Sequence, residues 1–192
     1  MLKKKLKNYK VILASGSPRR QQFFKDLNIE FITQLKDVDE VYPDHLIGSE
    51  ITDYLAELKS KAFENLKDKE ILITSDTIVW HKNKALGKPT SIKEAKNMLL
   101  SLSGNSHKVI TSVCIRTKNN QKIINDTTVV FFKKLAEKEV DFYIKHFKPL
   151  DKAGAYGIQE WIGLIGIEKI EGSYFNVVGL PTEKLYKELI RL

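Results

Sequence analysis

The sequence is short of the features that staple, anchor or export a protein. Its single cysteine, Cys114, lies in an apolar run, so the chain can form neither an intramolecular disulfide nor a paired-cysteine metal site. One such cysteine suits a reducing cytoplasm. No run approaches the roughly 20 apolar residues of a membrane span, and residues 1–10 lack the apolar stretch of a signal sequence. We therefore expect a cytoplasmic protein with no membrane partner.

Several common catalytic signatures are also absent. The histidines neither cluster nor show the HExxH spacing that would indicate a zinc site. The chain contains no GxxxxGK[ST] phosphate loop and no GxSxG nucleophile turn. No internal repeat and no low-complexity linker divides the 192 residues. We therefore predict a single α/β domain over residues 1–192 whose chemistry needs none of these motifs.

The net charge of +8 invites a nucleic-acid partner. Residues 1–10 hold five lysines and no acid, which leaves a net charge of only +3 for the rest of the chain. This segment has no interleaved aromatic platform on which bases could stack. We interpret residues 1–9 as a solvated basic tail and do not expect a nucleic-acid partner.

Hydrophobic periodicity predicts alternating strands and helices. We expect a mixed twisted sheet flanked by helices, with two sub-lobes around a central cleft. The predicted strands are 10–14, 29–33, 71–80 (interrupted at 75–77), 108–117, 122–132, 161–170 and 173–179. The predicted helices are 18–27, 49–66, one from the Ser91/Glu94 capping box to Gly104, one ending at Pro149, and one that begins at Thr182.

The loop after the first predicted strand is a candidate phosphate site. It reads Ala14-Ser15-Gly16-Ser17-Pro18-Arg19-Arg20. Small residues let the backbone approach a ligand, and Pro18 suits the first helical position. A helix start carries unpaired N–H groups and partial positive charge, which the two arginines reinforce. The alternative is that Ser17 only caps a helix with a basic surface.

Asp76 is the second candidate, because an aspartate inside an apolar strand is costly to bury as an ion. A divalent cation or a cationic side chain could compensate it, and a carboxylate in a cleft can hold magnesium or accept a proton from water. The alternative is a solvent-facing aspartate at a bulge. Lys61, Lys88 and Glu40 are further candidates, although each alone is typical of a solvated surface charge.

Taken together, these stretches resemble the Maf family of nucleotide pyrophosphatases. The matching segments occur in family order and span about residues 11–190. They are Leu13–Arg20, Asp39-Glu40, Lys61-Ala62, Ser75–Val79, Leu86–Pro89, Leu102–Gly104, Asp151–Gln159 and Gly172–Pro181.

The resemblance implies a Maf/ITPase-like fold and hydrolysis of a nucleoside triphosphate to the monophosphate and pyrophosphate. It implies metal-assisted attack of water, with Mg²⁺ or Mn²⁺ as the divalent metal cofactor, and a homodimer. Asp76 would be the catalytic proton acceptor, and Asp76 and Glu40 would hold the metal. The residues that would hold phosphates are Ser15, Arg20, Lys61 and Lys88.

Base choice is also implied by the resemblance. Arg19, Thr77 and Gln159 match the branch that prefers dTTP and UTP, and normal or modified pyrimidine nucleotides would be substrates. Two positions depart from the family. Ser75 stands where alanine is usual, and Glu160-Trp161 follows Gln159 where glycines are common, which bears on the shape of the base pocket.

Two alternatives stay open from the sequence. One is a nucleotide- or nucleic-acid-binding regulator of septum formation and cell division that has no turnover. The other is a related enzyme for purine nucleotides.

Overall fold

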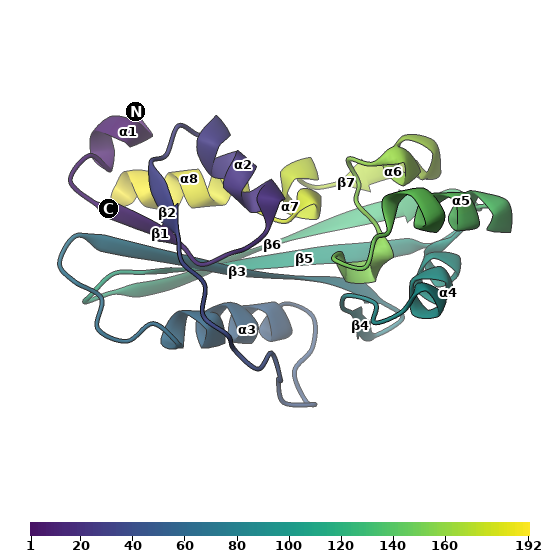
Figure 1. Ribbon diagram of the computed structural model, residues 1–192, viewed down its shortest axis with the longest axis horizontal. Coiled ribbons are helices and arrows are strands. Elements are labelled where there is room, and N and C mark those ends of the chain that lie inside the picture. Colours follow the sequence, from purple (N-terminus) through teal and green to yellow (C-terminus); the bar gives the residue numbers. More distant parts are fainter. The chain divides into compact units, whose positions relative to one another are not determined.

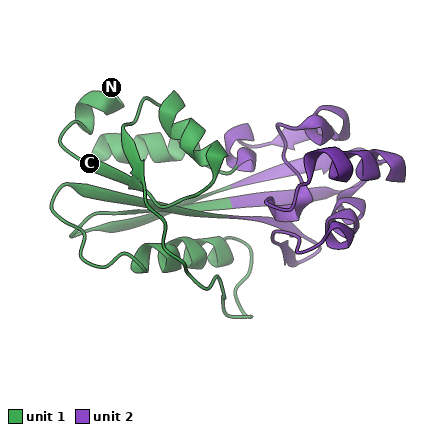
Figure 2. Ribbon diagram, in the orientation of Figure 1, with its two compact units in different colours: residues 1–76, 111–126, 179–192 green, residues 77–110, 127–178 purple.

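A computed structural model describes residues 1–192. The strands form a mixed seven-stranded sheet in the order β2-β1-β3-β5-β6-β7, with β4 paired to β3 (Figure 1). With the helices that accompany it, this sheet confirms the predicted α/β fold class. The chain divides into two compact units (Figure 2). Unit 1 comprises residues 1–76, 111–126 and 179–192, and unit 2 comprises residues 77–110 and 127–178. The division agrees with the two predicted sub-lobes, whereas the cleft and the single domain stay predictions.

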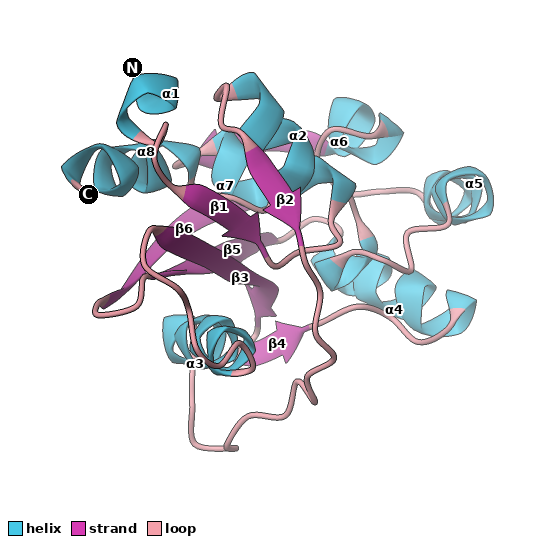
Figure 3. Ribbon diagram, turned by 60° about the vertical axis from the view of Figure 1, so that its left-hand side comes forward, coloured by secondary structure: helices cyan, strands magenta, loops and turns pink.

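Unit 1 is built around short parallel strands. β1 (Lys10–Leu13) pairs in parallel with β2 (Phe31–Thr33) and with the first part of β3 (Glu70–His81). The helices are α1 (Leu2–Lys5), α2 (Pro18–Asp26), α3 (Ser49–Lys61) and α8 (Thr182–Arg191). Helices α2 and α8 lie on one face of these strands and α3 on the other (Figure 1, Figure 3).

Because helices cover both faces of these strands, their residues are apolar in continuous runs. Parallel strands that are buried on two sides read as continuous apolar runs. The strand residues that are buried in this way are Val11, Ile12, Leu13, Ile71, Leu72 and Ile73. The predicted strand and helix on either side of the small-residue loop are therefore confirmed at the level of element type and order.

The basic N-terminal segment is only partly solvated. Its lysines are exposed, as expected, but Leu2 and Leu6 are buried in the core of unit 1 with Leu185 and Leu189 of α8. Burying two leucines contributes on the order of 2–3 kcal/mol each. The prediction of a solvated tail considered only the lysines and so overlooked the burial of these two leucines.

Unit 2 contains the remaining helices. They are α4 (Ile92–Leu102), α5 (Glu137–Phe147), a 3₁₀ turn η1 (Ala153–Ala155), α6 (Trp161–Gly166) and α7 (Tyr174–Val178). The strands are β4 (Lys84–Leu86), β7 (Ile167–Glu171) and parts of β3, β5 (Ser106–Arg116) and β6 (Gln121–Phe132). β4 pairs with β3, and β7 with β6, both antiparallel.

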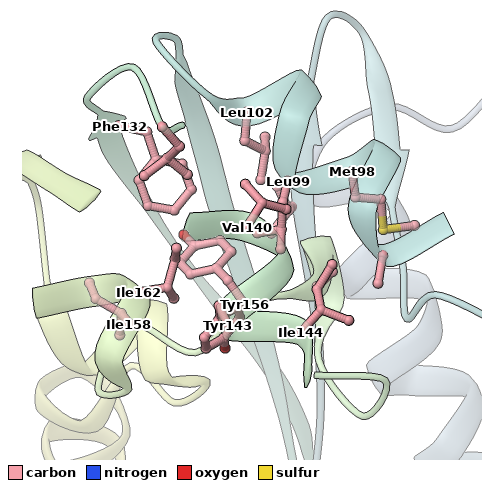
Figure 4. Packing of buried hydrophobic residues seen from close by; sticks show 14 of the residues in the cluster. Met98, Leu99, Leu102, Phe132, Val140, Tyr143, Ile144, Tyr156, Ile158 and Ile162 are labelled. Carbon is pink, nitrogen blue, oxygen red and sulfur yellow. The ribbon is translucent and has the colours of Figure 1, made fainter. Parts of the chain in front are cut away.

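The core of unit 2 gathers α4, α5 and α6 around Tyr156. Figure 4 shows Leu99, Val140, Tyr143 and Ile162 converging on this ring. The Tyr156 ring meets Phe132 edge-on, with the ring centroids 5.0 Å apart. Edge-to-face pairs of this kind add about 0.5–1.5 kcal/mol beyond the burial of their area.

The predicted strand 173–179 is wrong, and the predicted strand 161–170 is right only in its second half. Residues 161–166 form α6 and residues 174–178 form α7, so only Ile167–Glu171 of this region is a strand. A short apolar run does not distinguish a buried strand from a buried helix turn. Asn176 of α7 is fully buried, where its amide donates to the carbonyl of Val109 and to Thr128 Oγ1. Such long-range bonds leave no periodicity in the sequence.

Two element boundaries also differ. β3 runs without a break through Ser75, Asp76 and Thr77, where an interruption was predicted. α3 ends at Lys61 rather than at residue 66. The Ser91 cap is confirmed, since Ser91 Oγ accepts from the Glu94 N–H at 3.1 Å.

No helix of the chain combines the length and the apolar character needed to cross a bilayer.

Candidate active site

The small-residue loop after β1 is held in a fixed shape within unit 1. Ser17 caps α2, its Oγ accepting from the Arg20 N–H at 3.5 Å, and Pro18 is the first helical residue. Buried Ser15 accepts a bond from the Ser17 N–H at its own Oγ. The turn therefore ends at a preformed helix start, which favours an anion.

Arg20 joins this turn to the strand that carries Asp76. Its Nε donates to the Gly179 carbonyl at 2.9 Å, and its Nη1 donates to the Ser75 carbonyl at 3.0 Å and to Ser15 Oγ at 3.4 Å. Burial lowers the pKa of Arg20 to about 10, the charges of Asp76 and Glu40 oppose this, and Arg19 adds to it. The guanidinium remains protonated at neutral pH. These bonds place the arginine turn next to the segment of β3 that carries Asp76.

Asp76 is buried in β3, with 7 % of the residue exposed, and its charge is compensated by Lys59 of α3. Lys59 Nζ lies 2.7 Å from Asp76 Oδ1 and 3.1 Å from Glu40 Oε2. We call Asp76, Lys59 and Glu40 the ion cluster. The ammonium of Lys59 compensates the negative charge of the buried aspartate. It also brings the two predicted carboxylates, Asp76 and Glu40, close to one point.

Polar bonds fix α3 against the sheet and so fix Lys59. Thr52 Oγ1 and Ser112 Oγ are 2.6 Å apart, and Ser112 donates to Asp53 Oδ1, which ties the start of α3 to β5. Further along, Thr74 Oγ1 donates to the Ala56 carbonyl at 2.6 Å. Thr74 and Asp76 lie on the same face of β3, because side chains alternate along a strand.

Lys61 is not brought to the carboxylates. Its side chain is 63 % exposed and pairs with Glu57 one turn earlier on α3. Sequence reasoning missed Lys59, two residues before it. A signal was present, because Lys59 follows Leu55 and Ala56 at helical spacing and so falls on the buried stripe of α3. A lysine on an apolar stripe that faces a buried aspartate is the expected counter-ion, whereas the contact of Lys61 with phosphate stays a prediction.

The donor set at the ion cluster suits a hard divalent cation. Two carboxylates meet at one point, and Mg²⁺ is commonly bound through one or two carboxylates together with substrate phosphates. No group of three or more acidic, histidine or cysteine ligands forms anywhere in the chain, the ion cluster included. Asp76 and Glu40 could therefore hold such a cation only together with further ligands, such as the oxygens of a bound polyphosphate.

Three predicted residues belong to unit 2. Thr77 follows Asp76 in β3, Lys88 is exposed just after β4, and Gln159 is exposed beyond η1. The loops of Lys88 and Gln159 are linked, since the Gly154 N–H donates to the Gly87 carbonyl at 3.0 Å. Gly154 adopts a positive φ of 66°, and an added Cβ would lie 2.7 Å from Val79 Cγ2, so only glycine fits there.

The two departures from the family pattern have different surroundings. Ser75 is 2 % exposed, and its hydroxyl has no hydrogen-bond partner. Glu160 forms an ion pair with Lys152, with Oε1 and Nζ 3.1 Å apart, and Trp161 is the first residue of α6, with its ring centroid 4.7 Å from that of Phe142. The glutamate is therefore part of the framework of its loop.

Residues 10–192 match the family described as Maf-like protein. The chain belongs to the Maf family. A relative from Flavobacterium johnsoniae, named dTTP/UTP pyrophosphatase, is 58 % identical over the whole of both chains. One from Christiangramia forsetii, of the same name, is 60 % identical over 98 % of this chain and 97 % of its own. The predicted family is confirmed.

Solved structures support the fold. This Maf protein resembles the Staphylococcus aureus Ham1 protein with a TM-score of 0.52 and 18 % identity, covering 93 % of this chain and 99 % of the other. A HAM1 protein from Coxiella burnetii gives a TM-score of 0.53 and 17 % identity, covering 96 % and 100 %. At these identities the likeness shows the architecture alone.

Proposed function

We propose that this Maf protein hydrolyses dTTP and UTP, normal or modified, to the monophosphate and pyrophosphate. The observation that carries the proposal is the meeting of Asp76 and Glu40 at Lys59, beside the arginine turn that Arg20 joins to β3. The names of full-length relatives at 58 and 60 % identity support the reaction and its substrates. No comparison supports a regulator without turnover.

Charge decides how a triphosphate would be held. The substrate brings about four negative charges, and the start of α2 with Arg19 and Ser15 offers donors to its phosphates. Lys88, an exposed cation of unit 2, would also hold a phosphate. Arg20, whose donors already reach three oxygens of the fold, holds the turn against β3. Most of the acceleration in phosphoryl transfer comes from positioning and charge stabilisation, so no covalent nucleophile is needed.

Asp76 would accept the proton of the attacking water. Lys59 fixes Asp76 Oδ1 by a charge-assisted hydrogen bond of 2.7 Å, which orients the carboxylate on its strand. Asp76 and Glu40 would also hold Mg²⁺ or Mn²⁺, which, when bound, lowers the cost of charge on the phosphates. Positions Arg19, Thr77 and Gln159 would select the pyrimidine base.

Location and assembly complete the proposal. A cytoplasmic location agrees with one buried, unpaired cysteine, Cys114. We expect a homodimer and no nucleic-acid partner, from the family resemblance and the confinement of the charge excess to the N-terminal segment.

A panel of triphosphates tests the function. The full chain is assayed for pyrophosphate release from dTTP, UTP, dCTP, dATP and dGTP with Mg²⁺, Mn²⁺ or EDTA. We expect dTTP and UTP to be preferred by about tenfold or more, which corresponds to one or two discriminating contacts, and activity to disappear in EDTA. Release from no triphosphate would rule out the proposed reaction. A purine preference would reject the base assignment, and full activity in EDTA would reject the metal.

A further inference from the structure

The loop of residues 151–160, which carries Gln159, is organised around a buried ammonium. The Lys152 side chain is 8 % exposed, and its Nζ lies 2.6 Å from Asp151 Oδ1 and 3.1 Å from Glu160 Oε1. Asp151 is 58 % exposed, whereas Glu160 is 20 % exposed. Glu160 is therefore the shielded counter-ion, and the one on which the buried lysine chiefly depends.

The second oxygen of Glu160 reaches the core of unit 2. Glu160 Oε2 accepts from the hydroxyl of Tyr143, a fully buried residue of α5, and that hydroxyl accepts from the Gly157 N–H at 3.0 Å. Burial, and then the bond to Glu160, raise the pKa of Tyr143 far above its usual value, so the phenol stays a donor at neutral pH. One series of contacts thus links Lys152, Glu160, Tyr143 and Gly157.

Glycines in the loop and next to it allow the close contacts described above. A Cβ on Gly157 would lie 2.9 Å from Glu160 Cδ and 3.1 Å from Lys152 Cε, so a side chain at this position would displace the ion pair from the backbone. A Cβ on Gly163 would overlap the Ile158 carbonyl. These close approaches leave the loop little freedom.

Gln159 lies between two fixed neighbours. Ile158 is 6 % exposed and belongs to the cluster around Tyr156 and Ile162 (Figure 4), and Glu160 is held as described. Gln159 itself is exposed. A peptide anchored on both sides fixes the point and direction from which the Gln159 side chain leaves the backbone, and this positioning favours recognition of a base.

We propose that Glu160 is a positioning residue for base recognition, setting the orientation of Gln159 through Lys152 and Tyr143. This inference rests on the proposed function, in which Gln159 meets the base. Glu160 itself contacts no substrate. The position at which the sequence departs from the family's common glycine would then carry part of the pyrimidine preference.

Two variants separate orientation from stability. Glu160→Gln keeps the shape of the side chain but removes the charge that faces Lys152, and Tyr143→Phe removes the hydroxyl that joins Glu160 to Gly157. Glu168→Gln, at an exposed glutamate of unit 2, is the matched charge control. For each we measure kcat and KM with dTTP, UTP and dCTP, and the melting temperature.

We expect both variants to raise KM for dTTP about tenfold and to reduce the preference for dTTP over dCTP by a similar factor. Their kcat should change less than about threefold, and Glu168→Gln should behave as the wild type. A loss of melting temperature with unchanged KM and base preference would overturn the inference, as would an equal loss of kcat on all bases.

The inference and the proposed function fail differently. Wild-type protein that releases no pyrophosphate refutes the function, and the base preference is then measured as the affinity of dTTP against dCTP in the same variants. If Glu160→Gln does not fold, Tyr143→Phe, which removes one oxygen atom, decides the question by the same readouts.

Discussion

The two units each hold a lysine between two carboxylates, and the two clusters differ in what surrounds them. In unit 1, Lys59 meets Asp76 and Glu40, and the Glu40 side chain is half exposed. In unit 2, Lys152 meets Asp151 and Glu160, and the second oxygen of Glu160 is taken by Tyr143. In the first cluster the shielded carboxylate, Asp76, is bound by the lysine at Oδ1, whereas in the second the shielded carboxylate, Glu160, is bound by the lysine at one oxygen and by Tyr143 at the other. The same ion triad therefore suits chemistry in one place and orientation in the other.

The largest expected effect comes from Asp76→Asn. The variant keeps the size of the side chain but removes the proton acceptor, so we expect turnover of dTTP to fall about 10²-fold or more while the melting temperature stays near that of the wild type. Pyrophosphate release under saturating substrate measures this. Asp68→Asn, at a surface ion pair with Lys118, is the control and should stay active. Unchanged release in Asp76→Asn would remove Asp76 from the mechanism.

The next largest effect is expected for Lys59, and Lys61 is its control. Lys59→Met leaves Asp76 and Glu40 together without the positive charge that orients them, and we expect kcat/KM to fall about tenfold or more. Lys61→Met removes an exposed pair within one helix, which is worth at most about 0.5 kcal/mol, so activity should change less than twofold. Steady-state kinetics on dTTP provides the measurement. Equal losses in both variants would contradict the placement of Lys59.

The third prediction concerns pH and unit 2, which holds both buried histidines, His81 and His107. His107 Nε2 lies 2.7 Å from the Tyr156 hydroxyl, while its Nδ1 has no partner. Burial, and the nearby His81, lower the pKa of His107 from 6.5 to about 3. The unfolded chain therefore takes up this proton first as the pH falls. The stability is complete above about pH 6.5 and is lost as the pH falls towards 3.

We expect the free energy of unfolding to decrease by on the order of 2–3 kcal/mol from this group between pH 7.5 and 4.5. Urea unfolding at several pH values measures it. His107→Gln cannot titrate and should show a shallower dependence on pH, although it is less stable at pH 7.5. An identical slope in wild type and variant would assign the effect to other groups.

The smallest effect sharpens the contrast between hydroxyl groups. The Tyr143 hydroxyl has two partners in unit 2, whereas the Ser75 hydroxyl in unit 1 is buried with none. Ser75→Ala should therefore stabilise the protein by about 1 kcal/mol, because an unsatisfied buried hydroxyl is removed. Its strand neighbour Thr74, which donates to the Ala56 carbonyl, is the opposite case, and Thr74→Val should destabilise by a similar amount. Thermal unfolding compares the two, and a destabilised Ser75→Ala would contradict the assignment.

Local signals predicted the elements whose causes are local. Ser17 and Pro18 determine the start of α2 by capping and by a fixed φ, and both are visible in the sequence. The helix α7 was not predicted, because it is held by contacts with distant residues, namely the bonds of Asn176 to Val109 and Thr128.

The candidate site shows the same division. Asp76 was found because an acid in an apolar strand is anomalous by itself. Lys59 was missed because Lys59 and Lys61 are only two residues apart in the same helix. They differ in the face of α3 on which they lie, and only Lys59 is on the face that meets β3. The role of Glu160 depends on Tyr143, which lies in another helix, so no motif that spans the loop could reveal it.

Because β3 is continuous through Asp76, the site is sensitive to insertions and deletions within this strand. Neighbouring residues in a strand point to opposite faces, so adding or deleting one residue between Leu72 and Asp76 would turn the carboxylate away from α3 and offer Lys59 a hydroxyl instead. Point substitutions in this strand can be graded in effect, whereas a shift of one position abolishes the arrangement outright. Among relatives, this segment should therefore tolerate changes of residue far better than changes of spacing.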